Sequence, residues 1–225
     1  MSESFVDEYL VIQNGIKKIR PKGVLYVTDL TKPCLRSAYY GIVYEREYPL
    51  TTQRIFESGK MIEDWWVDIL RRIPGIEILG TQVKARYITD ELEIHGRVDI
   101  LCQHKDGAIV AHEVKSAKST FYVKEPKQSH LEQLQFYLTC LGLEFGQVDY
   151  LDKTVLLQGG GAEADRVDKT FKVKRDSAVF AELVGRAKTL MKCWESEQPP
   201  KATECWLCDY CLFKETCKES REILL

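Results

Sequence analysis

The chain predicts an α/β (α+β) fold, in which a mixed sheet is flanked by helices and followed by a cysteine-rich segment. Three observations lead to this prediction. Runs rich in β-branched and aromatic residues, separated by turn residues, fill the middle of the 225-residue chain. Segments with apolar residues at helical spacing precede and follow these runs. Four of the eight cysteines lie near the end of the chain, after residue 204.

Two helices are predicted before the sheet. The first covers Val27–Glu45 and begins with a capping signal at Thr28 or Asp29. The second covers residues 51–72, and Pro74-Gly75 ends it. Apolar residues recur along this second helix at helical spacing, namely Ile55, Ile62, Trp66, Ile69 and Ile73.

Five strands and two more helices complete the predicted core. The strands are expected at about residues 76–88, 92–104, 108–117, 147–158 and 167–175, and the helices at Lys127–Phe145 and Asp176–Glu197. The run Gly159-Gly160-Gly161 is interpreted as a hairpin tip, because the lysine and helix of a phosphate-binding loop do not follow it. Pro199-Pro200 then separates a core of residues 1–198 from a tail of residues 199–225.

The turn Lys105-Asp106-Gly107 joins the second and third strands into a hairpin. A two-residue loop would send Glu113 to the face opposite Asp99. A three-residue loop, with Gly107 in the left-handed conformation, instead sets Asp99 opposite Glu113. We predict the three-residue loop, because it lets the two carboxylates share a cation.

The same register makes two further predictions. It gathers a core face that consists of Val98, Ile100, Cys102, Val110 and Val114, together with His112. It also sets Arg97 opposite Lys115, and like charges that face each other repel. The strands should therefore splay there, or Arg97 should turn toward solvent or phosphate.

Asp99, Glu113 and Lys115 carry the chemistry that the hairpin suggests. Paired carboxylate oxygens suit Mg²⁺ or Mn²⁺, which bind through one or two carboxylates plus substrate phosphate oxygens. In phosphodiester hydrolysis the cation activates water, while a lysine orients the water or stabilises the developing negative charge. The alternative is that the three residues form the solvated side of a strand.

Composition limits the class of protein. The 32 basic and 34 acidic residues give a net charge of -2, so a strongly basic nucleic-acid binder is excluded, although a local basic groove stays open. The first residues lack a signal-peptide pattern, and no apolar stretch is long enough to cross a membrane. We therefore expect a cytoplasmic protein. In that compartment, eight cysteines favour metal or cluster ligation over disulfides.

The tail holds a strong ligand pattern, C-x2-C-x2-C-x5-C, formed by Cys205, Cys208, Cys211 and Cys217. These four residues could make a local site, and zinc is the alternative metal for any four-cysteine set. The spacing differs from the bacterial ferredoxin pattern. Cys102 and Cys140 fall on apolar faces and are predicted to be buried thiols without a role.

Three motifs occur in a fixed order: Gly96-x-x-Asp99, then Glu113-x-Lys115, then a helix with Gln133 and Tyr137. This order resembles the PD-(D/E)xK nuclease superfamily in its RecB-like branch. With Cys34 upstream and the tail cysteines, the chain looks like the CRISPR-associated RecB-type iron-sulfur exonucleases, the family numbered four among the Cas proteins. The resemblance covers nearly the whole chain and implies a PD-(D/E)xK nuclease-like sheet.

The resemblance also implies roles for the residues of the site. Asp99, Glu113 and the backbone carbonyl of Val114 would bind the metal, and Lys115 would be the catalytic lysine. Gln133 and Tyr137 would act beside it, contacting DNA or the water. The family usually has a histidine four residues after a glycine in the preceding helix. Glu63 stands in that place after Gly59, so a third carboxylate ligand is expected.

For the cysteines, the resemblance selects Cys34, Cys208, Cys211 and Cys217 as ligands of an iron-sulfur cluster and leaves Cys205 spare. A 4Fe-4S cluster is favoured, and 2Fe-2S stays open. Such a cluster would hold the tail against the N-terminal region, as a long crosslink does, with redox sensing as a second hypothesis.

The resemblance implies a function as well. It predicts a Mg²⁺ or Mn²⁺-dependent exonuclease that degrades single-stranded DNA from 5′ to 3′ and processes DNA ends for CRISPR spacer integrase proteins. A stand-alone DNA repair nuclease of the same superfamily is one alternative. A non-catalytic DNA-binding scaffold subunit of an integration complex is another, because Glu63 replaces the usual histidine. A homo-oligomer stays open.

Overall fold

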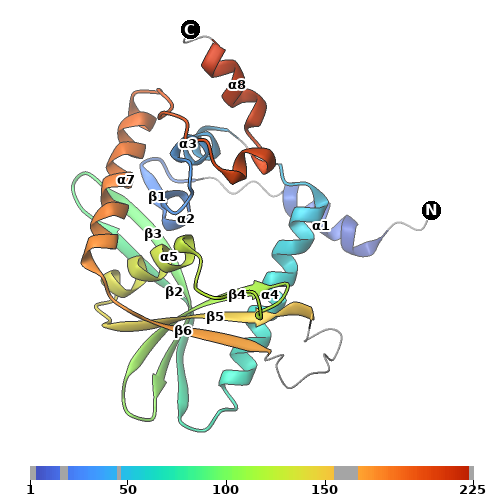
Figure 1. The fold of residues 1–225 in the computed structure, drawn as a ribbon, viewed down its shortest axis with the longest axis vertical. Coiled ribbons are helices and arrows are strands. Elements are labelled where there is room, and N and C mark those ends of the chain that lie inside the picture. The colour runs from blue at the N-terminus through green and yellow to red at the C-terminus, as the bar shows by residue number, and fades with distance from the viewer. Residues whose placement is uncertain (1–3, 16–19, 45–46, 155–166, 223–225) are drawn as a thin grey trace.

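The computed structural model describes residues 4–15, 20–44, 47–154 and 167–222, and shows a mixed sheet with helices on both sides (Figure 1). In these residues the strands are β1 (Val24–Tyr26), β2 (Ile76–Ile88), β3 (Glu93–His104), β4 (Ile109–Ala117), β5 (Phe145–Asp152) and β6 (Asp168–Lys174). The helices are α1 (Phe5–Gly15), α2 (Val27–Leu30), α3 (Leu35–Val43), α4 (Leu50–Leu70), α5 (Gln128–Cys140), α7 (Ser177–Glu195) and α8 (Lys214–Glu222), with a 3-10 helix η1 (Trp206–Tyr210).

The described strands form one six-stranded sheet in the order β1-β3-β4-β5-β6, and β2 pairs with β3. Neighbours in the chain pair antiparallel, β2 with β3, β3 with β4, and β5 with β6. The pairs β1–β3 and β4–β5 are parallel, and the helix α5 provides the crossover between β4 and β5. The sheet is therefore mixed, as the sequence predicted.

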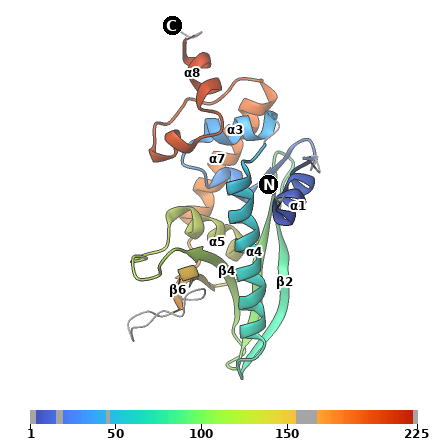
Figure 2. The ribbon, with the colours of Figure 1, turned by 90° about the vertical axis from the view of Figure 1, so that its right-hand side faces the viewer.

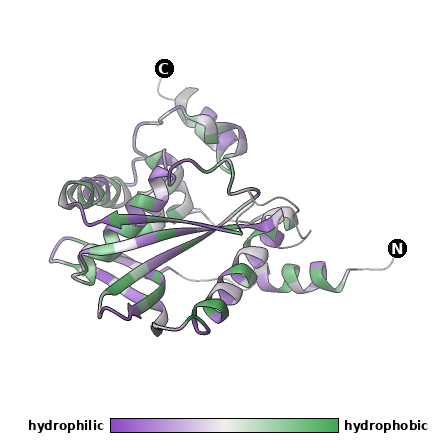
Figure 3. Cartoon of the chain, turned by 60° about the horizontal axis from the view of Figure 1, so that its bottom comes forward, coloured by the Kyte–Doolittle hydropathy of each residue, from purple (hydrophilic) through white to green (hydrophobic). Residues whose placement is uncertain are grey.

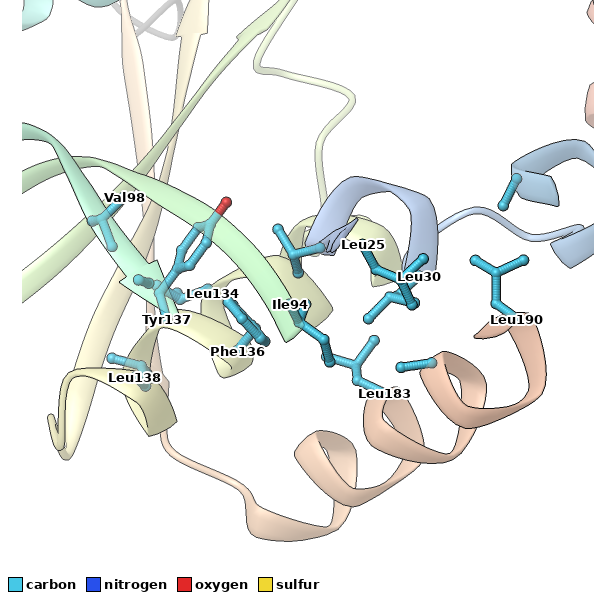
Figure 4. Close-up of a cluster of buried hydrophobic side chains, with 14 of the residues drawn as sticks. Leu25, Leu30, Ile94, Val98, Leu134, Phe136, Tyr137, Leu138, Leu183 and Leu190 are labelled. Carbon is cyan, nitrogen blue, oxygen red and sulfur yellow. The ribbon is translucent and has the colours of Figure 1, made fainter. Parts of the chain in front are cut away.

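The two faces of the sheet bury separate hydrophobic clusters. On one face, residues of α2, β3, α5 and α7 pack together, as the labelled side chains in Figure 4 show. On the other face, Trp66, Val67 and Leu70 of α4 pack against Ile100, Cys102, Val114 and Leu151. Helix α4 runs along its own side of the sheet, away from α5 and α7 (Figure 2). Figure 3 shows that apolar and polar residues alternate along these elements, as expected for elements that bury one side.

The hairpin between β3 and β4 has the predicted three-residue loop. The amide of His104 donates to the carbonyl of Ala108 at 2.9 Å, and the amide of Gly107 donates to the carbonyl of His104 at 2.8 Å. Gly107 has a φ of 83°, the left-handed conformation that the loop requires. The ladder pairs Ile100 with His112, which is the predicted register.

Beyond that pair the two strands separate. β3 continues toward β1, whereas residues 113–117 of β4 pair with β5. Asp99 and Glu113 are therefore not paired in the ladder, which ends at Ile100 and His112. The amide of Val114 donates to the Asp99 carboxylate at 2.8 Å. Arg97 is exposed. The predicted splay and the predicted outward turn of Arg97 both occur.

The predicted core face is wrong in one respect. Val98 packs in the cluster with α5, but Ile100, Cys102 and Val114 pack against α4, and Val110 is only half-buried. The side-chain alternation of β3 therefore changes phase at Asp99. The irregularity coincides with Gln82 on β2, which lies between the paired positions Thr81–Ile100 and Val83–Val98.

His112 is tolerated on the buried face because it pairs with a carboxylate. Its Nδ1 lies 2.7 Å from Oδ2 of Asp149, and both side chains are fully buried. Burial lowers the pKa of His112, but the hydrogen bonds to Asp149 and Cys102 outweigh it and raise the pKa to about 9. A buried ion pair therefore replaces the apolar contact that the pattern predicted.

Several predicted boundaries need correction. The predicted helix Val27–Glu45 is divided into α2 and α3, since Pro33 disfavours helical backbone at Lys32, and Tyr26 is the first cap. The predicted helix Lys127–Phe145 ends at Cys140, and Gly142 follows with a φ of 68°. β5 starts earlier than predicted, and the run Gly159-Gly160-Gly161 lies outside the described residues. The strand β1 and the helix α1 were not predicted.

Candidate active site

A polar pocket opens where β3 and β4 separate, between α4 and the start of α5. Its lining combines acidic, basic and apolar side chains: Ile55, Phe56, Gly59, Lys60, Ile62, Glu63, Asp99, Val114, Lys115, Ser116, Lys127 and His130. Asp99 reaches it because the phase of β3 changes there. Glu63 reaches it from the middle of α4.

Glu113 is the most deeply buried carboxylate of this site, with an exposed fraction of 1%. The ammonium of Lys115 lies 2.5 Å from its Oε1. Its Oε2 is buried and has no hydrogen-bond partner within the described residues. A buried carboxylate oxygen without a partner is costly, so this atom is suited to receive a ligand.

Three carboxylates at or beside this pocket have raised pKa values, and burial is the largest cause in each. Burial raises the pKa of Glu113 to about 8, and Asp99 adds to the increase while Lys115 opposes it. Burial also raises the pKa of Asp99 against the influence of Lys115, and burial and Asp99 raise the pKa of Glu63. When all three carboxylates are ionised, the site therefore carries more negative charge than Lys115 can neutralise.

Lys115 supplies only part of that charge. Burial lowers its pKa, but Glu113 and Asp99 outweigh burial and raise it, so the ammonium stays protonated. A divalent cation would complete the neutralisation. The donor set of carboxylate oxygens, with the unpartnered Glu113 Oε2, fits a hard cation such as Mg²⁺ or Mn²⁺. In the described part of the chain, no three His, Cys, Asp or Glu side chains are already arranged around a metal position.

Gln82 is a site residue that the sequence analysis missed. Its Nε2 donates to Oε1 of Glu63 and, at 3.4 Å, to Oδ1 of Asp99. Its φ is 51°, which is unusual for a residue with a side chain. Gln82 thus links α4 to β3 from a position of β2 that lies between the paired residues Thr81 and Val83. Pairing the predicted strands 76–88 and 92–104 would have placed Gln82 opposite Asp99, and this position is the signal that could have identified it.

Tyr137 lies at the site, whereas Gln133 does not contact the carboxylates. The Tyr137 hydroxyl group is buried near Glu113 and Asp99, and burial, reinforced by these two charges, raises its pKa well above the usual value. The side-chain amide of Gln133 instead donates to Oγ1 of Thr31 at 3.5 Å. A Cβ at Gly96 would lie 2.6 Å from the Tyr137 ring, so glycine is required for this packing.

His130 stands at the edge of the pocket beside Lys127. Its Nδ1 lies 2.7 Å from the hydroxyl group of Tyr150. Burial, together with the charges of Lys115 and Lys127, lowers the pKa of His130 to about 3. The imidazole is therefore neutral at physiological pH.

The cysteine-rich tail lies against the N-terminal helices, where Figure 2 shows η1 and α8 near α3. Arg36 Nε donates to the carbonyl of Pro200 at 2.6 Å, and the rings of Tyr40 and Phe213 are 5.7 Å apart. These contacts join residues that are far apart in the sequence. They bring the tail to the helix that follows Cys34.

The cysteines themselves approach the same region. The amide of Cys205 donates to Sγ of Cys208 at 3.5 Å, and Cys34 is close enough to add to the raised pKa of Cys205, which burial dominates. Cys211 lies 3.8 Å from Oγ of Ser37, and Cys217 packs at the edge of the larger cluster. No cysteine of the described residues forms a disulfide. Thiolates are the donors that zinc and iron-sulfur clusters take, but among the described residues no three of these cysteines surround one metal position.

The mixed sheet brings acidic residues and a lysine together at the point where β3 and β4 separate. The family model of the PD-(D/E)XK nuclease superfamily matches residues 34–218. The chain belongs to this superfamily. No curated protein matches the chain in sequence.

Solved structures share the fold. SSO0001 superposes with a TM-score of 0.68 at 20% identity, covering 96% of this chain and 97% of that chain. An alkaline exonuclease (LHK-Exo) from Laribacter hongkongensis has a TM-score of 0.54 at 14% identity, covering 90% and 95%. A phage related exonuclease from Haemophilus somnus 129PT has a TM-score of 0.54 at 11% identity, covering 82% and 97%. At these identities the similarity establishes the fold.

None of the helices in the described ranges has the length and apolar character needed to cross a membrane.

Proposed function

We propose that this protein is a Mg²⁺ or Mn²⁺-dependent exonuclease that degrades single-stranded DNA from 5′ to 3′. One observation carries the proposal: Oε2 of Glu113 is buried without a hydrogen-bond partner among the described residues, beside Asp99 and Lys115, in a chain of the PD-(D/E)XK nuclease superfamily. Two of the structures that share the fold are named exonucleases, which favours action at DNA ends.

In this proposal, Asp99, Glu113, Glu63 and the carbonyl of Val114 hold the cation. When bound, the cation supplies positive charge that offsets the charge developing on the scissile phosphate. Val114 fixes Asp99 through its amide, and Gln82 fixes Glu63 and Asp99 through its own. These contacts keep the carboxylates in place before the substrate arrives.

Lys115 has the second role. Its ammonium stays protonated beside Glu113, within the same pocket as the carboxylates. From there it can donate a hydrogen bond to a phosphate oxygen or to the attacking water. Tyr137 is buried close enough to Glu113 and Asp99 for their charges to raise its pKa, so in this proposal it acts beside the metal site. Gln133 donates to Thr31 and would have to leave that partner to contact DNA or the water.

The test is a cleavage assay with single-stranded DNA labelled at the 5′ end or the 3′ end. We expect cleavage with Mg²⁺ or Mn²⁺, none with EDTA, and immediate release of a 5′ label as a short product. Lys115→Met should abolish cleavage, whereas Lys172→Met, which changes an exposed lysine on β6, should not. A wild-type protein that binds DNA without cleaving it would favour the scaffold hypothesis.

We further propose that Cys34, Cys208, Cys211 and Cys217 hold an iron-sulfur cluster, with 4Fe-4S favoured over 2Fe-2S. The packing of the tail on α3 supports this, because it brings the last three cysteines to the region of Cys34. The cluster would hold the 199–225 segment against the 1–198 core. The role of the cluster is then structural.

Absorption spectra and metal analysis test the cluster. The purified protein should be brown and contain iron, and Cys208→Ser should lose both colour and iron. Cys205→Ser is the matched control and should keep them. A colourless protein that contains zinc would overturn the proposal, and loss of iron in Cys205→Ser would replace the ligand set.

The cellular role that we propose is the processing of DNA ends for CRISPR spacer integrase proteins. The resemblance to the CRISPR-associated exonucleases supports it. Co-purification of the protein with an integrase encoded nearby, and shortened integration substrates in its presence, are the expected results. Activity without any such partner would favour a stand-alone DNA repair nuclease.

A further inference from the structure

The loop that joins β4 to α5 starts and ends at the candidate active site. Ser116, at the end of β4, and Lys127, just before α5, both line the pocket that holds Asp99 and Lys115. The residues between them project from the body of the molecule, where Figure 2 shows the loop beside the start of α5. A nucleic-acid strand that leaves the pocket on this side would pass over the loop.

Two aromatic rings stand exposed on the loop. Phe121 is 56% exposed and Tyr122 is 79% exposed. Their ring centroids are 5.2 Å apart, with the rings perpendicular. Neither ring is packed into the protein core, although large apolar side chains usually are.

The backbone on either side of the rings is anchored. Thr120 is buried, and its amide donates to Oδ2 of the buried Asp152 at 2.8 Å. Val123 packs at the edge of the larger hydrophobic cluster, and its amide donates to the carbonyl of Thr120 at 3.1 Å. Phe121 and Tyr122 are therefore held outward by a fixed turn, at a low entropic cost for a binding partner.

The charge on the loop suits a polyanion. Residues 118–127 contain Lys118, Lys124 and Lys127 against the single acidic residue Glu125. The ammonium of Lys124 lies 4.9 Å from the centroid of the Phe121 ring. Basic residues beside exposed aromatic rings are the arrangement that binds single-stranded nucleic acid, since bases stack on the rings and lysines neutralise phosphates.

We propose that Phe121 and Tyr122 form a base-stacking platform that holds single-stranded DNA beside the active site. This inference rests on the proposed function, because it assigns the polyanion to DNA on the way to or from the pocket. Duplex bases are already stacked on one another, so the platform favours single strands over duplexes. It would also make a single-stranded end the preferred substrate.

Binding of fluorescein-labelled oligo(dT), measured by anisotropy in EDTA, tests the platform without cleavage. The double variant Phe121→Ala and Tyr122→Ala should lose roughly 10-fold or more in affinity, since stacking contributes about 1 to 3 kcal/mol per base. The double variant Phe121→Trp and Tyr122→Trp should restore binding. Tyr210→Ala, which removes another exposed ring on the tail, should leave binding unchanged.

The platform is overturned if the double alanine variant binds oligo(dT) as the wild type does, or if the wild type does not bind it. An equal loss for blunt duplex DNA would also overturn it, because it would show a contribution other than stacking. Cleavage of the same oligonucleotide with Mn²⁺ is measured separately. If the wild type binds but does not cleave, the proposed nuclease function fails while the platform stands.

Discussion

Gln82 donates from its side-chain amide to Glu63, and its backbone has a φ of 51°. A residue with a side chain adopts this conformation at a cost of about 1 to 3 kcal/mol, and such strain concentrates at functional sites. Here the strained position also reaches Asp99, so one side chain joins the two carboxylates that stand on different elements. The strain and the hydrogen bonds together indicate a positioning role.

Gln82→Gly should separate strain from function. Glycine adopts a positive φ without strain, so the variant should keep a free energy of unfolding within about 1 kcal/mol of the wild type. The loss of the amide should lower Mn²⁺ affinity or cleavage rate by roughly 10-fold or more, as for other residues that orient metal ligands. Calorimetric titration with Mn²⁺ and thermal unfolding measure the two effects. Unchanged Mn²⁺ affinity and rate would contradict the positioning role.

Mn²⁺ binding should release a proton from Glu113. Its pKa is raised to about 8, so the metal-free site carries this proton at neutral pH, and the cation must displace it. Affinity for Mn²⁺ should therefore rise with pH, by up to about tenfold per unit below pH 8. Titrations in two buffers that differ in ionisation enthalpy detect the proton. Glu113→Gln should show weaker binding without this pH dependence, and a pH-independent affinity in the wild type would contradict the prediction.

Gly96→Ala should destabilise the protein. The added methyl group would lie 2.6 Å from the Tyr137 ring and 3.1 Å from the Phe136 ring, both of which are buried. Overpacking of this kind costs about 1 to 3 kcal/mol. The exposed Gly185 in α7 is the matched control, because its methyl group would meet nothing within 4 Å and should stabilise the helix by about 0.5 to 1 kcal/mol. Urea unfolding of both variants measures these changes in the free energy of unfolding. No loss of stability in Gly96→Ala would show that the Tyr137 ring is loosely packed.

His130 should make stability fall in mild acid. Burial lowers the pKa of His130 from 6.5 to about 3 in the folded protein. The unfolded chain therefore binds a proton at this histidine at a higher pH than the folded protein does, so the free energy of unfolding falls as the pH falls from 6.5 toward 3. Between pH 7 and pH 5 the loss should be up to about 2 kcal/mol. His130→Gln should lose less over that range, as measured by urea unfolding at each pH. Parallel losses in both proteins would show that His130 is not buried as a neutral group.

The hairpin and its acidic residues were predictable because they depend on local rules. The turn Lys105-Asp106-Gly107 allows the loop that the register requires, whereas Asp99 reaches the pocket where the alternation of β3 is broken. The separation of the strands was also predictable, because Arg97 and Lys115 repel each other. The change of phase at Asp99 was not predictable. It coincides with the positive φ of Gln82, and a glutamine in the sequence does not indicate that backbone conformation.

Longer-range features were less accessible to sequence analysis. Strand β1 has three residues and is defined by its pairing with β3, so it has little pattern of its own. His112 looked out of place on an apolar face, because its partner Asp149 comes from another strand of the sheet. Pro33, by contrast, was a visible signal that should have divided the first predicted helix.

The rate of DNA cleavage by Asp99→Asn tests the central claim most directly. The wild type, Asp99→Asn and the control Asp64→Asn, whose side chain is exposed on α4, are compared with Mn²⁺ and saturating single-stranded DNA in one turnover. We expect Asp99→Asn to be slower by roughly 100-fold or more while it remains folded, and Asp64→Asn to match the wild type. Equal rates for wild type and Asp99→Asn would contradict the assignment of this pocket as the active site.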